Sequence, residues 1–142
     1  MSSQNVVTDL INRALPLIRA DMRRFAAGLD AMTAANERPS ASAMSALRSA
    51  RDRAAAARQS LLHAPGRIYL IPGGGQAIRG FLYLNQGLSA LIGGLSSTGS
   101  TATGELAAAR TLLARSGDEF YAADRALGCP YGCHKPPVVP RP

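Results

Sequence analysis

The residues best suited to chemistry in this sequence lie near its C-terminus, in GCPYGCHK at 128–135. Cys129 and Cys133 are the two cysteines of the chain, and His134 follows the second directly. Thiolates and imidazoles are ligands that zinc prefers, so these three residues with His63 form one candidate metal site. Cys129 and Cys133 also form a candidate disulfide, either with each other or with another chain, and free thiols are the remaining alternative.

The same ending carries a resemblance to a known family. A helical chain that closes on GCPYGCHK resembles the c-prime cytochromes, four-helix proteins that bind haem covalently near the C-terminus. The resemblance implies that Cys129 and Cys133 hold the haem vinyl groups and that His134 ligates the iron. This sequence departs from the family in having three residues rather than two between the cysteines, a proline-rich ending and no visible export signal.

The sequence shows no catalytic constellation. Both histidines lie near expected chain breaks, and no serine or cysteine has the local sequence of a nucleophile elbow. The glycine-rich PGGGQAIRG at 72–80 lacks the Gly-Lys-Ser/Thr ending of a phosphate-binding loop, so we predict a linker there. We therefore expect a protein that is not an enzyme and has no cofactor, with haem or zinc as the alternative.

The chain is strongly basic and almost all of its cations are arginine. Sixteen basic and nine acidic residues give a net charge of +7, and Lys135 is the one lysine. Guanidinium groups suit phosphates and carboxylates, although a GC-rich genome also favours arginine. The candidate contacts to phosphate or to an acidic partner are clustered in one segment: Arg48, Arg51, Arg53 and Arg58. Association with nucleic acid is thus an alternative function, without a recognised DNA- or RNA-binding module.

Composition predicts helices as the elements that position these residues. Alanine and leucine dominate the 46% of hydrophobic residues and aromatics are 5%, which favours helices over sheets. We predict an all-α, up-down bundle of about four helices at 1–128, with a Gly/Pro-rich break after the second helix. An extended, Cys- and Pro-rich tail occupies 129–142.

The first two helices are predicted from apolar spacing. An apolar stripe in the first helix recurs at steps of three or four residues: Val7, Ile11, Ala14, Ile18, Met22, Phe25, Leu29 and Met32. Pro16 lies inside it, so we expect a kink or a short helix leading into a longer one. Ser40 or Ser42 caps the second helix at 43–62, and its apolar face is mostly alanine.

The third helix, expected at 76–95, contains glycines at seven-residue intervals: Gly80, Gly87 and Gly94. Because glycine is costly inside a helix, this strip predicts close packing of another helix, either in this chain or in a second copy. Residues 66–75 before it form a strand, a loop or an arm. Residues 96–105 are expected to be a polar link, with Thr101 or Thr103 as the next helix cap.

The fourth helix is expected to follow this link and to end at Gly128 in the usual C-terminal glycine position. The Ser-Gly-Asp sequence at 116–118 suggests a division of this helix into two pieces.

These features lead to a hypothesis of assembly. We expect a non-catalytic structural subunit that packs against copies of itself or other proteins, such as a virion, tail or filament component. The segment KPPVVPRP at 135–142 cannot join a helix but suits docking in a groove, and the cysteines suit crosslinking. The lack of an export signal or a membrane span predicts a soluble protein made in the cytoplasm, with an extracellular particle as one destination.

Overall fold

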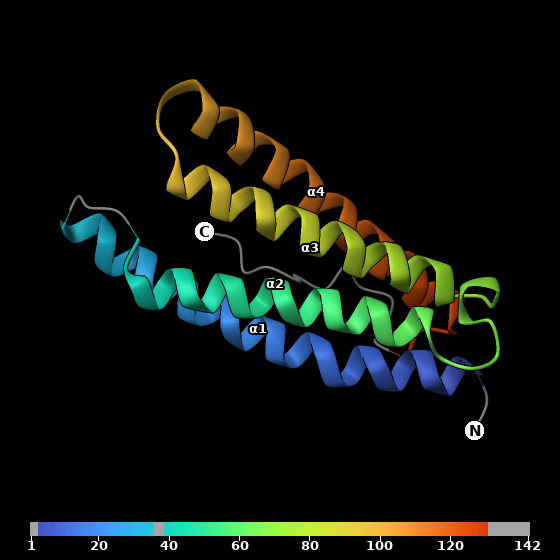
Figure 1. Cartoon of the computed structure of the whole chain (residues 1–142). Coiled ribbons are helices and arrows are strands. Elements are labelled where there is room, and N and C mark those ends of the chain that lie inside the picture. The colour runs from blue at the N-terminus through green and yellow to red at the C-terminus, as the bar shows by residue number, and fades with distance from the viewer. Residues whose placement is uncertain (1–2, 36–38, 131–142) are drawn as a thin grey trace.

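The structure is a computed structural model that describes residues 3–35 and 39–130. Over that part of the chain it contains helices and no strand. The elements are α1 (Ser3–Ala35), α2 (Ala41–Leu62), the short 3-10 helix η1 (Ile68–Leu70), α3 (Gly74–Ser96) and α4 (Gly99–Ala126). The four α-helices run alternately up and down (Figure 1), which confirms the predicted all-α bundle.

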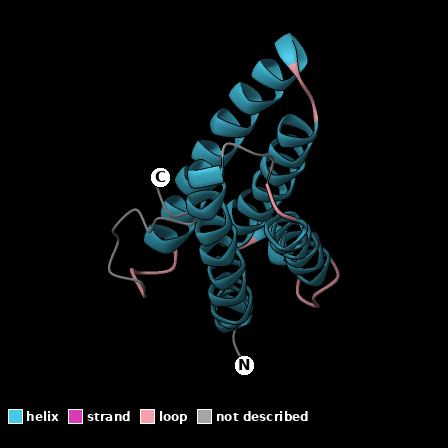
Figure 2. Ribbon diagram, turned by 90° about the vertical axis from the view of Figure 1, so that its left-hand side faces the viewer, coloured by secondary structure: helices cyan, strands magenta, loops and turns pink. Residues whose placement is uncertain are grey.

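Two helical hairpins make up the bundle. Helix α1 packs against α2, α2 against α3, and α3 against α4, so the main contacts follow the order of the chain. The hairpins lie close together at the end that holds η1 and diverge toward the other end (Figure 1). Figure 2 shows the same helices after a quarter turn. The bundle is therefore tightest at the η1 end.

The apolar stripe predicted for the first helix faces the core of the bundle. Its buried members, with one further leucine, are Val7, Ile11, Leu15, Ile18, Met22 and Phe25. The side chains of Leu29 and Met32 lie outside the described part of the structure. Helix α1 continues through Pro16, so the alternative of two separate helices is wrong. Buried residues on both sides of Pro16 stabilise the helix despite the hydrogen bond that proline removes.

Helix α2 begins as predicted after Ser40, whose hydroxyl accepts a hydrogen bond from the Ala43 amide at 3.1 Å. Its buried face consists mainly of alanine: Ala43, Ala46, Leu47, Ala50, Ala54, Ala57 and Leu61. A Cβ added at Gly28 of α1 would lie 2.7 Å from the Ala43 Cβ. Small side chains on both helices thus allow a close approach of α1 and α2.

The glycine strip of α3 packs against α4 of the same chain. A Cβ added at each glycine would lie 2.7–2.9 Å from an α4 side chain, the pairs being Gly80 with Phe120, Gly87 with Leu113, and Gly94 with Leu106. The partners also recur every seven residues but in the opposite direction, so both helices keep one antiparallel register. The same register continues to Gly73 and Leu127, where the added Cβ would lie 2.8 Å from the leucine side chain.

Two expectations for the last helix are wrong. Helix α4 starts at Gly99 with Thr98 as its cap residue, so residues 99–105 are helical rather than a link. Helix α4 is also continuous through 116–118. The Ser116 hydroxyl is buried and donates a hydrogen bond to the Gly80 carbonyl at 2.7 Å, so this serine joins two helices instead of ending one.

Gly117→Ala is expected to raise the free energy of unfolding by about 0.5–1 kcal/mol, because alanine is the better helix former and loses less chain entropy. Gly117 lies inside α4, and a Cβ added there would have no neighbour within 4 Å. Chemical denaturation monitored by circular dichroism measures the change. Gly128→Ala is the contrasting variant, since a φ of 87° at Gly128 makes alanine unfavourable by about 1 kcal/mol. A loss of stability in Gly117→Ala would contradict the packing seen around α4.

Candidate functional site

The cysteine motif begins where α4 ends. The Gly128 amide donates to the Arg125 carbonyl at 3.2 Å and the Cys129 amide to the Asp124 carbonyl at 2.9 Å, the two bonds of a Schellman cap. This confirms the predicted helix end at Gly128. Cys129 also has a positive φ of 64° and is disulfide-bonded. Cys133 and His134 lie outside the described residues, so their predicted roles stay predictions.

His63 lies at the other predicted ligand position. It follows the last residue of α2, is exposed, and its Nε2 lies 3.1 Å from the Gln59 Oε1. Among the described residues, no group of three or more histidines, cysteines or acids is arranged to hold a metal ion. The zinc and haem alternatives need Cys129 without its disulfide, and they need Cys133 and His134, which lie outside the described residues, so they stay predictions.

The four candidate arginines of α2 lie in different surroundings. Arg48 and Arg53 line one shallow depression on the outer face of α2. The Arg51 Nε contacts the Asp52 Oδ1 at 3.1 Å, and the Arg51 carbonyl accepts a hydrogen bond from Asn85 of α3. Arg58 is half-buried, and its Nε has no hydrogen-bond partner among the residues that the structure describes. The structure therefore brings together two of the four predicted contacts, Arg48 and Arg53.

Sequence reasoning missed the acid that organises this region. Asp21 of α1 is 1% exposed and accepts bonds from Arg24 of α1 and from Arg53 of α2, the latter at 3.1 Å. No local signal marks Asp21, because its α2 partner is 32 residues away in the chain. The one hint is an acid close to the apolar stripe of α1.

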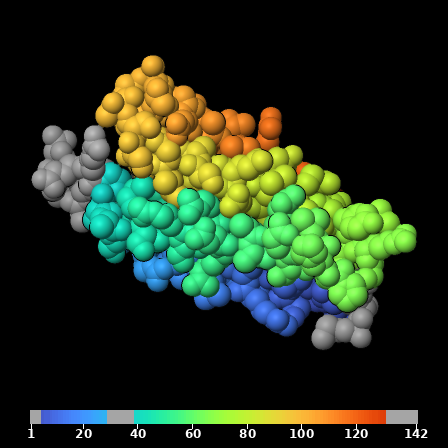
Figure 3. Space-filling model, in the orientation of Figure 1, coloured from blue at the N-terminus to red at the C-terminus, as the bar shows by residue number. Residues whose placement is uncertain are grey.

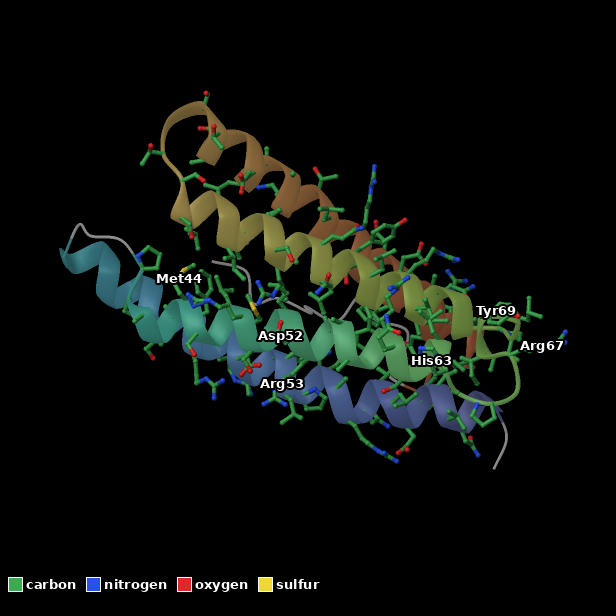
Figure 4. All side chains as sticks on the ribbon, in the orientation of Figure 1. Met44, Asp52, Arg53, His63, Arg67 and Tyr69 are labelled. Carbon is green, nitrogen blue, oxygen red and sulfur yellow. The ribbon has the colours of Figure 1, made fainter. Side chains whose placement is uncertain are left out.

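Residues 66–75 are neither a strand nor an arm but a compact turn around η1. Tyr69 and Leu70 project from it with 53% and 65% of their surface exposed. Ile68, directly before them, is 1% exposed and anchors the turn in the core. Figure 4 shows Arg67 and Tyr69 at one end of the molecule, near His63. We call Arg67, Tyr69 and Leu70 the turn surface.

Backbone contacts hold the turn surface in place. Successive amides donate to carbonyls three residues earlier, from Leu70 to Arg67 at 2.9 Å, from Ile71 to Ile68 at 3.2 Å, and from Gly74 to Ile71 at 3.0 Å. A Cβ at Gly74 would lie 1.8 Å from the Ile68 carbonyl oxygen, so the turn is packed directly on the first residue of α3. The Gly73 amide is bonded to the Gln76 side chain at 3.1 Å rather than open to a phosphate. The exposed side chains thus stand on a fixed backbone.

The turn surface lies at the end of the bundle where the C-terminal segment starts. The close approach of Gly73 to Leu127 connects the end of the turn with the residue that caps α4. Cys129 follows two residues later. The turn surface and the start of the C-terminal segment therefore lie at one end of the molecule.

A cavity of about 270 Å³ lies between α1 and α4. Its apolar walls are Ile11, Leu15, Pro16 and Phe120, and its polar groups are Asn12, Arg19 and Asp124. Neither a nucleophile with an adjacent base nor a set of metal ligands lines this cavity. The cavity is therefore a gap between two packed helices with a few polar groups in its wall.

Comparisons with known proteins give no family for the chain. No family model matches it, and neither a curated protein nor a solved structure matches it. Within the described residues, none of the helices has the length and apolar character needed to cross a bilayer.

Proposed function

We propose that this protein is a non-catalytic helical assembly subunit that binds copies of itself or another protein through the turn surface. The observation that carries the proposal is the exposed Tyr69–Leu70 pair on a fixed backbone. Residues 129–142 begin at the same end of the bundle and supply a docking or crosslinking segment. A virion, tail or filament component is the concrete form of this proposal.

Physical reasons support a contact at this position. Binding is weakened when side chains and loops must be ordered, and a turn that is already fixed avoids much of that cost. Tyrosine is enriched among the residues that contribute most to protein interfaces. The glycine strip, in contrast, supplies no argument for an external partner, because α4 already covers it.

Tyr69→Ser/Leu70→Ser is expected to weaken self-association of the full chain by at least about tenfold. Burial of both side chains contributes about 2–4 kcal/mol, and about 1.4 kcal/mol corresponds to a factor of ten. Size-exclusion chromatography with light scattering over a concentration series measures the change. A reducing buffer removes any contribution from disulfides between chains.

Leu17→Ser is the matched control, because Leu17 is also a large apolar side chain, 49% exposed, but lies in the middle of α1. Its association is expected to equal that of the unchanged chain. A monomer at every concentration, or equal association of all three proteins, would contradict self-assembly through the turn surface.

A further inference from the structure

A buried acid fixes two arginines at the surface of α1 and α2. The Asp21 side chain is 2% exposed, whereas those of Arg24 and Arg53 are 63% and 42% exposed. One carboxylate oxygen accepts from Arg24 and the other from the Arg53 Nε. The acid therefore lies beneath the two guanidinium groups. A buried carboxylate is weak evidence for stability, but it holds the arginines in defined positions.

Further phosphate-binding groups surround Arg53 on α2. Its Nε also contacts the Ser49 hydroxyl at 3.4 Å. The shallow depression on this face is lined by Ser45, Arg48, Ser49, Asp52, Arg53 and Ala56. Arg48 is exposed and forms no ion pair with any described residue, while Asp52 is paired with Arg51. We call Arg24, Ser45, Arg48, Ser49 and Arg53 the arginine patch.

The net charge of the chain favours an anionic partner. Residues 1–104 contain eleven basic and five acidic residues, whereas residues 105–142 contain five and four. The net charges of these two segments are thus +6 and +1, and all residues of the arginine patch belong to 1–104. A concentrated positive field raises the rate at which a polyanion meets this surface. Figure 3 shows α2, in teal to green, along the visible face of the molecule.

The shape of the patch indicates a large ligand rather than a small one. A site for a small anion is a concave pocket that encloses it, and this depression is shallow. Attachment to a membrane surface requires an apolar helix face beside the basic one. Leu62, Tyr69 and Leu70 lie in or next to the turn, and Leu106 lies on α4. Among the α1 side chains that the structure describes, this leaves Leu17 as the one large exposed apolar residue.

We propose that the arginine patch binds the phosphate backbone of duplex nucleic acid without reading its sequence. Guanidinium and hydroxyl donors suit phosphate oxygens, and contacts to the backbone carry no sequence information. The patch has no aromatic residue for stacking on bases, which separates it from surfaces that bind single strands. This binding is independent of the turn surface at the end of the bundle.

The test measures binding of the full chain to a labelled DNA duplex of mixed sequence by fluorescence anisotropy over a salt series. The unchanged chain is expected to bind at low salt. The logarithm of its binding constant is expected to fall linearly with the logarithm of the salt concentration. Arg24→Ala/Arg48→Ala is expected to bind at least about tenfold more weakly and to reduce the salt slope by about 2, one for each lost phosphate contact. Arg48→Ala alone keeps the bonds of Asp21 and is expected to reduce the slope by about 1.

Arg110→Ala/Arg115→Ala is the matched control, because both arginines are exposed on α4 and the change in net charge is the same. Its affinity is expected to stay within about threefold of the unchanged chain. An equal loss of DNA affinity in both double variants would mean that only the net charge of the chain matters, and it would overturn the proposal. Binding to anionic vesicles without binding to DNA, or no binding to DNA at low salt, would overturn it as well.

Discussion

Gly80→Leu is expected to lower the free energy of unfolding by about 3 kcal/mol, the upper part of the range for overpacked cores. A Cβ at Gly80 would lie 2.9 Å from two ring atoms of Phe120. Phe120 is buried and contacts Phe81 edge to face, with ring centroids 4.8 Å apart, so it has little room to move. The larger leucine must therefore separate α3 from α4. Denaturation with urea, followed by circular dichroism, measures the loss.

Gly117→Leu provides the control for this substitution. The residue change is the same, but Gly117 has no neighbour within 4 Å of an added Cβ. We expect the control to keep or slightly raise stability, since leucine is the better helix former. Phe120→Ala is expected to lower the free energy of unfolding less in the Gly80→Leu background than in the unchanged chain, because it removes the ring that the leucine meets. Equal stability of Gly80→Leu and Gly117→Leu would mean that α3 and α4 do not meet in this register.

Asp21→Ala is expected to lower the free energy of unfolding by about 2–3 kcal/mol. The carboxylate makes two charge-assisted hydrogen bonds, one of which connects α1 to α2. Its removal leaves two arginines facing each other without the acid between them. Because both guanidinium groups reach solvent, we expect less than the 3–5 kcal/mol typical of a fully buried pair. Thermal and urea denaturation measure the difference.

Asp52→Ala removes the same charge from a neighbouring position. The Asp52 side chain is 70% exposed and contacts Arg51, so the expected change is within about 0.5 kcal/mol. A double-mutant cycle of Asp21→Ala with Arg53→Met then isolates the link between α1 and α2. Similar stability of Asp21→Ala and Asp52→Ala would show that the buried acid does not hold the two helices together.

Sequence reasoning succeeded where the decisive interaction is local. The apolar stripe of α1, the cap at Ser40 and the helix end at Gly128 each depend on residues within a few positions of one another. It failed where a local signal is opposed by packing. Ser, Thr and Gly at 96–105 favour a loop, but Leu106 packs on Gly94 and pins the start of α4 to the end of α3.

The candidate surfaces were predictable only in part. The sequence marks the arginines of α2 but not which of them share a surface, because that depends on how α2 is rotated against α1 and α3. The Asp21 carboxylate accepts a hydrogen bond from Arg53, and the Asn85 side-chain amide of α3 donates one to the Arg51 carbonyl. The sequence of 66–75 is equally compatible with a strand, a loop and an arm, so it does not predict the fixed turn with its exposed Tyr69 and Leu70. The form of this turn depends on the contact of Ile68 with Gly74.

The sequence by itself determined that the chain is helical, roughly where its helices lie and that its third helix needs a close neighbour. Side-chain size and spacing are sufficient for those conclusions, because they act within one helix. Only the tertiary structure decided that this neighbour is α4, that Asp21 connects α1 with α2, and that the turn and the start of the C-terminal segment share one end. Those facts depend on contacts between residues far apart in the chain. The spacing of residues within one helix does not determine which of them pair.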